Sequence, residues 1–137
     1  MGICWDQWFP EAARAMTLLG AEILLYPTAI GSEPTLGKDS SIHWRNTMAG
    51  HAAANMMPVI ASNRIGTESD ENSMMTFYGS SFIADHHGEI AVQADRHTAG
   101  VITAEFDLDA LADERREWGI FRDRRPELYQ ILMTHGI

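Results

Sequence analysis

The stretch GICWDQWFPE, residues 2–11, decides how the rest of this chain is interpreted. Its first residues are apolar and strand-like, but they are too few to form a useful core strand. An aromatic-rich turn follows Cys4, and Pro10 then begins a helical pattern that stops at Gly20, as proline suits the first turn of a helix and glycine its end. The predicted order is a strand stub, a cysteine, a short turn and a helix over residues 11–19.

Cys4 is the only cysteine, which excludes an internal disulfide and a cysteine-rich zinc site. A thiol at a turn before a helix can lie near the helix N-terminus, where the macrodipole favours the nucleophilic thiolate. The alternative is a buried core thiol, the usual place of a lone cysteine. Composition leaves both interpretations open, and a lone cysteine fits a reducing, cytoplasmic compartment.

Length and composition limit the class of protein. The 137 residues suffice for one domain, so we expect residues 1–137 to form part of a single domain. A hydrophobic content of 45% with 21% charged residues is typical of a soluble globular domain. No apolar run approaches the roughly 20 residues of a membrane-spanning helix, and no signal peptide is visible. The formal charge of −9 argues against general binding to nucleic acid or to an anionic membrane.

Apolar periodicity and turn residues predict the remaining elements. Helical spacing and capping residues identify the helices, and short apolar or alternating runs identify the strands. We expect strands over residues 21–26, 58–62, 80–84, 89–94 and 100–106, and helices over residues 42–57, 108–118 and 126–133.

This order predicts a layered α/β protein with a mixed sheet, because the later strands follow one another through short turns. The apolar helices would cover one face of the sheet. Few helices remain for the opposite face, so we expect another copy of the chain, or another half of the domain, to cover it.

Further motifs are spread along the chain, at residues 25–34, 43–45, 50–52, 61–66, 76–84 and 118–129. Together with residues 2–11, they resemble the nitrilase (carbon–nitrogen hydrolase) superfamily. The cysteine motif by itself indicates only the superfamily. The segments at 26–34 and 118–129 are more specific and are similar to the N-carbamoylputrescine amidohydrolase branch.

The resemblance implies a four-layer α-β-β-α sandwich, of which about half is present, and a Glu-Lys-Cys catalytic set with Cys4 as nucleophile. It implies no metal and no cofactor. In the family the catalytic Glu and Lys lie well before the cysteine, and only three residues precede Cys4. We therefore expect this chain to be the C-terminal half of such an enzyme, with little or no amidase activity by itself. Family members also form dimers and larger oligomers, so a homo-oligomer is expected.

The same resemblance suggests a carbamoyl diamine as the small-molecule substrate. The branch that hydrolyses carbamoyl-D-amino acids carries basic residues where this chain has Gln7 and Trp8, neither of which is positively charged. We expect Glu33 to bind the distal ammonium, Trp5 or Trp8 to contact the aliphatic chain, and Thr28 to belong to the same substrate site. The alternative for Glu33 is a solvated loop acid.

Other residues carry weaker signals. His86 and His87 form an adjacent pair in a turn, which is weak evidence for a metal site. His51 is expected to be a packed, hydrogen-bonded core histidine rather than a partner of the cysteine. Two further functions remain open: a related hydrolase with a different carbamoyl or amide substrate, and a non-catalytic remnant that self-associates.

Overall fold

The computed structural model describes residues 1–32, 37–71 and 73–136. The chain divides into two compact units, Met1–Phe106 and Asp107–Ile137, and each is described by itself.

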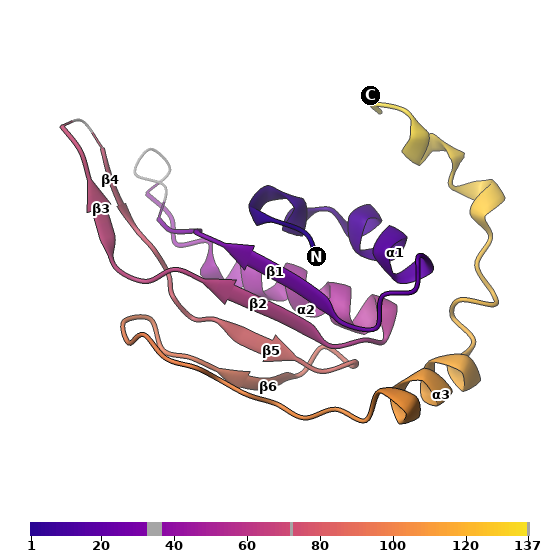
Figure 1. Cartoon of the computed structure of the whole chain (residues 1–137). Coiled ribbons are helices and arrows are strands. Elements are labelled where there is room, and N and C mark those ends of the chain that lie inside the picture. The colour runs from indigo at the N-terminus through magenta and orange to yellow at the C-terminus, as the bar shows by residue number, and fades with distance from the viewer. Residues whose placement is uncertain (33–36, 72, 137) are drawn as a thin grey trace. The chain divides into compact units, whose positions relative to one another are not determined.

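Among its described residues, the first unit contains three helices (Figure 1). The 3-10 helix η1 spans Cys4–Trp8, α1 spans Pro10–Leu18, and α2 spans Ser41–Asn55. Both predicted α-helices are confirmed to within two residues at each end. The expected turn after Cys4 is itself helical, because hydrogen bonds of the 3-10 type close over the five residues that begin with the cysteine.

A four-stranded mixed sheet forms the centre of this unit, in the order β1-β2-β5-β6. Its strands are β1 (Leu24–Thr28), β2 (Val59–Asn63), β5 (Phe82–Ala84) and β6 (Ile90–Gln93). β1 and β2 run parallel, and the chain crosses between them through α2, whereas the other neighbouring pairs are antiparallel. The predicted mixed α/β sheet is confirmed.

Three strand predictions need correction. β1 does not stop before Pro27 but includes it, which is compatible with a terminal strand of the described sheet because proline lacks only the ladder donor. Between the strands expected at residues 58–62 and 80–84, two further strands were not predicted: β3 (Thr67–Ser69) pairs with β4 (Met74–Thr76) in a separate two-stranded sheet. Residues 100–106 form no strand, since their alternation finds no neighbouring strand to pair with.

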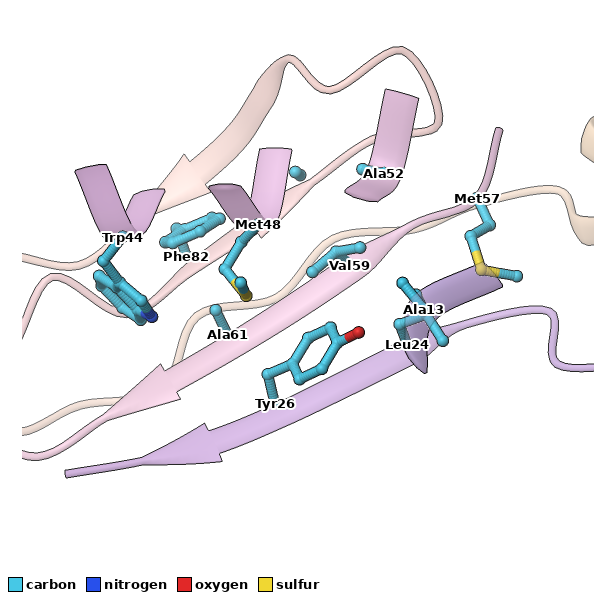
Figure 2. Close-up of a cluster of buried hydrophobic side chains, with 11 residues drawn as sticks. Ala13, Leu24, Tyr26, Trp44, Met48, Ala52, Met57, Val59, Ala61 and Phe82 are labelled. Carbon is cyan, nitrogen blue, oxygen red and sulfur yellow. The ribbon is translucent and has the colours of Figure 1, made fainter. Parts of the chain in front are cut away.

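The core lies between one face of the sheet and the helices α1 and α2 (Figure 2). Alternate residues of the strands point into it, as the period of two requires. Leu24 and Tyr26 come from β1, Val59 and Ala61 from β2, and Phe82 from β5, all essentially inaccessible to solvent. From the helices the core receives Ala13, Trp44, Met48 and Ala52.

The opposite face of the sheet carries a row of apolar side chains, which we call the open-face row. Leu25 pairs with Ile60, Ile60 with Ile83, and Ile83 with Val92, so the row crosses all four strands. Leu25 is 41% exposed, Ile60 and Val92 are half-buried, and only Ile83 is buried. The helices of this unit contribute their buried side chains to the other face, as the sequence predicts.

The second unit is helical. α3 spans Leu108–Trp118, as predicted, and begins where the side chain of Asp107 accepts a hydrogen bond from Ala110 N at 3.0 Å, which makes Asp107 its N-cap. The expected terminal helix is two short 3-10 helices, Pro126–Leu128 and Gln130–Met133. None of these three helices contains a buried residue. Within the described residues, no helix has the length and apolar character needed to cross a membrane.

Candidate functional site

Cys4 lies at the first position of η1 and is exposed. Its backbone is left-handed, with φ of 52°. A residue with a Cβ rarely adopts this conformation, and it persists only where the surroundings hold it in place. The sulfur is therefore accessible on a constrained backbone, which is unlike the buried core thiol considered as the alternative.

The short helix after Cys4 is closed by its own hydrogen bonds. Asp6 N donates to Ile3 O at 3.2 Å, and Ile3 N donates to the Asp6 carboxylate at 3.1 Å. Because the first helical bond begins at Asp6, the N–H of Trp5 precedes the hydrogen-bonded ladder. α1 begins at Pro10, six residues after Cys4, so the helix that starts at the cysteine itself is the short η1.

Gln7 is the buried residue of η1, with 1% of its surface exposed. Its Nε2 donates to Thr28 Oγ1 at 3.2 Å, and its Oε1 accepts from the indole Nε1 of Trp44 at 2.7 Å. The indole N–H can only donate, so the orientation of the amide is determined. Gln7 therefore joins the turn of Cys4 to β1 and to α2.

His51 makes a further link to the same turn. Its Nε2 lies 2.8 Å from Gln7 O, and since a carbonyl only accepts, this nitrogen carries the proton. Burial lowers the pKa of His51, outweighing the opposite effects of the bond to Gln7 and of Glu11. The prediction of a packed, hydrogen-bonded core histidine is confirmed.

Aromatic side chains flank the cysteine. Trp5 is 70% exposed, and its ring meets that of Trp8 edge to face at a centroid distance of 6.3 Å. The Trp8 ring in turn lies 4.9 Å from the imidazole of His43, which comes from the first turn of α2. Trp5, which directly follows Cys4 in the sequence, therefore belongs to a cluster of aromatic rings with Trp8 and His43, and a contact of Trp5 or Trp8 with an aliphatic chain stays a prediction.

Thr28 lies at the carboxyl end of β1, where its hydroxyl accepts the bond from Gln7. Glu33 lies outside the described residues, so its expected contact with an ammonium stays a prediction. The chain that leads to it is held: Ile30 N donates to Asn63 Oδ1 at 2.9 Å, and Ser32 N donates to Thr76 O at 2.9 Å. Residues 30–32 are therefore held at the end of β2 and beside β4.

Two other polar clusters are explained by local structure. Ligand atoms of Asp85, His86 and His87 lie within 4.8 Å of one another, but Asp85 Oδ1 already accepts from the backbone N–H groups of His87 and Glu89, as in an ordinary Asx turn. This arrangement adds nothing to the weak metal signal of the sequence.

A cavity of about 210 Å³ at the start of α2 is lined in part by Arg45 and Arg96. The guanidinium of Arg96 binds Asp39 at 2.7 Å and the hydroxyl of Ser41 at 2.6 Å. Of the two arginines that line the cavity, Arg96 is therefore paired with a carboxylate of the same chain. Its lining does not include Cys4.

Sequence reasoning missed Gln7 and Trp44 as parts of this site. The sequence shows Gln7 only as an uncharged position after Cys4, whereas the structure shows that its side chain is buried. The signal in the sequence that could have indicated a buried, hydrogen-bonded Gln7 is its uncharged amide within an aromatic-rich turn. Asn63 was also missed, although its Nδ2 donates to Ile30 O at 3.0 Å and Gly79 O at 3.1 Å and so ties two loops to the end of β2.

Comparison with known proteins adds the family. A family model described as carbon-nitrogen hydrolase matches residues 1–116. An Arabidopsis thaliana protein named N-carbamoylputrescine amidase is 60% identical over 98% of this chain and 46% of its own length, and a Francisella tularensis citrullinase is 62% identical over 94% and 46%. A crystal structure of a carbon-nitrogen hydrolase from Helicobacter pylori superposes with a TM-score of 0.88 at 42% identity, over 98% of this chain and 48% of that one. The chain thus spans about half the length of the relatives that it matches.

Proposed function

The chain belongs to the carbon–nitrogen hydrolase family, and we propose that it supplies the cysteine nucleophile for hydrolysis of a carbamoylated diamine, with N-carbamoylputrescine as the substrate. The observation that carries this proposal is the exposed Cys4 on a constrained left-handed turn, followed directly by Trp5, whose ring contacts that of Trp8. Relatives with 60% and 62% identity, both named for carbamoyl substrates, support the same class of reaction.

In the proposed reaction the Cys4 thiolate attacks the carbamoyl carbon, and the carbonyl oxygen becomes an oxyanion. Collapse of this intermediate breaks the bond to the terminal nitrogen, which leaves as ammonia after protonation, and an S-carbamoyl thioester remains. Water then attacks that carbon and the C–S bond breaks, so the thiol is restored. The resulting carbamate loses CO2 and releases the free diamine. The Trp5 N–H, which precedes the ladder of η1, is the proposed donor to the oxyanion.

The reaction also needs a base for the thiol and a second oxyanion donor, each commonly worth a factor of about 10² or more. The family resemblance assigns these roles to a Glu and a Lys upstream of the cysteine, and three residues precede Cys4 here. We therefore propose that these 137 residues release ammonia from N-carbamoylputrescine only slowly, and that the remainder of a full-length sandwich completes the site.

The test uses two proteins. One is the 137-residue chain, and the other joins the upstream part of the Arabidopsis thaliana relative to residue 1. We expect ammonia release from N-carbamoylputrescine by the joined protein, its loss in Cys4→Ala, and little release by the chain itself. A joined protein that folds and binds the substrate but keeps full activity as Cys4→Ala would contradict the proposal.

Glu33 is the proposed partner of the distal ammonium, because a carboxylate forms charge-assisted hydrogen bonds with an ammonium group. In the joined protein, Glu33→Gln is expected to raise KM strongly while leaving kcat largely unchanged. Glu22→Gln is the matched control, since Glu22 is exposed before β1 and lies outside the proposed site. An unchanged KM in Glu33→Gln would remove this assignment.

The citrullinase relative supports a second candidate substrate. Citrulline bears a carboxylate next to its amine, and binding it would call for a cationic partner such as an arginine. Comparing kcat/KM for the two substrates in the joined protein separates these candidates. The third candidate, a non-catalytic remnant, predicts a Cys4 that iodoacetamide modifies slowly at about pH 7, where an activated thiolate reacts quickly.

We also propose that the chain self-associates and works in a reducing compartment such as the cytoplasm. The open-face row and the exposed apolar residues near the C-terminus support the association. The latter are Leu128, Tyr129, Ile131, Leu132 and Met133. Sedimentation over a concentration series tests it, and a monomer at every concentration would contradict it.

A further inference from the structure

The position of Cys4 depends on residues that hold the chain on both sides of it. The left-handed backbone of Cys4 is unfavourable for a residue with a Cβ. Because Cys4 is exposed, its side chain is not held by burial in the core, and neighbouring residues must keep the turn in place.

On the N-terminal side the chain is attached to β1. Gly2 N donates to Leu25 O at 3.0 Å. A Cβ at Gly2 would lie 2.8 Å from Tyr26 Cε1, so this residue packs directly against the tyrosine ring. The backbone two residues before Cys4 is therefore fixed against the strand.

On the C-terminal side the attachment is Gln7, three residues after Cys4. Its amide binds Thr28 on β1 and Trp44 on α2, and its carbonyl accepts from His51, seven residues after Trp44 on the same side of α2. A side chain that used a single bond could rotate, whereas three bonds to two separate elements hold both the side chain and the backbone of Gln7.

We propose that Gln7 is the positioning residue for Cys4: its bonds to Thr28, Trp44 and His51 hold η1 so that the nucleophile keeps its left-handed backbone and a fixed direction toward the substrate. The inference rests on the proposed function for its significance, but the geometry it describes exists in the chain without substrate. Gln7 touches no reacting atom, so it acts through the backbone of Cys4.

A purely structural glutamine would make a different prediction. If Gln7 only filled the core, replacing it would lower the stability of the whole unit and leave the local motion at Cys4 unchanged in the folded protein. The order parameters of the Cys4 and Trp5 amides, measured by 15N relaxation on the 137-residue chain, separate the two cases because they report local motion in the native state.

In the unsubstituted chain we expect order parameters of about 0.85 at both amides, as for rigid backbone. Gln7→Leu removes both side-chain bonds, and we expect values below about 0.6, as for flexible backbone. Thr28→Val removes one bond with little change of shape and is expected to lower the values less, while Thr28→Ser keeps the hydroxyl and restores them. Thr17→Val is the matched control, because Thr17 is buried but bonds to Ala13 O and Met57, away from Gln7.

Unchanged order parameters in folded Gln7→Leu would overturn the proposal, as would an equal loss of order in Thr17→Val. If Gln7→Leu does not fold, the comparison of Thr28→Val with Thr28→Ser decides: equal values in these two would overturn it. The measurement needs no turnover, so failure to hydrolyse a carbamoyl diamine would count against the proposed function and leave this result intact.

Discussion

The indole nitrogen of Trp44 lies 2.7 Å from the side-chain oxygen of Gln7, so a buried residue of α2 holds a buried residue of the cysteine turn. Both side chains are 1% exposed, and water cannot replace either partner. A lost hydrogen bond here leaves an unsatisfied buried oxygen, which makes the pair unusually sensitive to substitution.

Trp44→Phe tests this sensitivity. It leaves Gln7 Oε1 without its donor, and we expect the free energy of unfolding to fall by at least about 1–3 kcal/mol, with the smaller ring adding to the loss. Urea unfolding followed by circular dichroism measures it. Trp118→Phe is the control, since Trp118 is 73% exposed, and an equal effect in both variants would contradict the prediction.

The buried imidazole of His51 predicts a dependence on pH. Burial lowers its pKa below the ordinary value of about 6.5, so below that pH the unfolded chain binds more protons than the folded one. Stability that is present above about pH 6.5 is therefore lost as the pH falls through the lowered pKa. His51→Gln offers Gln7 O a donor that does not titrate, and its unfolding free energy should fall less steeply between neutral and acidic pH. Parallel curves for the two proteins would show that His51 does not contribute.

Gly79 and Gly66 provide a matched pair. Both have positive φ, of 56° and 89°, so alanine is unfavourable at either position. A Cβ at Gly79 would meet Arg96 O at 2.6 Å, whereas no atom lies within 4 Å of a Cβ at Gly66. Gly79→Ala should therefore lower the thermal midpoint clearly more than Gly66→Ala, and the reverse order would show that the close approach of residue 96 is unimportant.

The contribution of the Asp107 N-cap to the stability of α3 can be tested by substitutions in the second unit. Asp107→Ala removes the acceptor for Ala110 N and should destabilise α3 by about 1 kcal/mol, seen as lost helical signal in circular dichroism. Asp107→Asn keeps a side-chain oxygen at the same place and should retain most of that signal. Equal loss in both variants would indicate that charge, rather than the hydrogen bond, stabilises the helix start.

The open-face row should drive association. Ile60→Glu puts a charge in the middle of the row, and we expect it to shift sedimentation of the chain toward the monomer at the same concentration. Asn46→Glu adds the same charge at an exposed position of α2 and should not do so. If both variants associate like the unsubstituted chain, the row is not the contact.

The helices and the mixed sheet were predictable because their signals are local. Pro10 and Asp107 are recognisable helix-start residues, and the apolar periodicity of residues 42–57 holds through α2. Residues 100–106 alternate like a strand, but a strand also needs a neighbour, which one segment's sequence does not specify.

In the candidate site, too, the features with a local sequence signal were predictable and those that depend on distant residues were not. Cys4 and the aromatic residues beside it were recognisable as a motif, and the core position of His51 followed from its small neighbours. The role of Gln7 depends on contacts with Thr28 and Trp44, which are 21 and 37 residues away in the chain. Only folding brings such partners together, so the residue type at position 7 predicted none of them.

The open-face row also limits the shape of anything that lies over it. A sheet with apolar side chains on both faces is usually an inner layer of a fold, and a second sheet packed on it would lie about 10 Å away. A protruding loop would touch Leu25 and miss Val92 on the far strand. A surface that covers the whole open-face row must instead be broad and shallow and must follow the twist of the four-stranded sheet. A second sheet, with its strands inclined by about 30° to those of the first, has this shape.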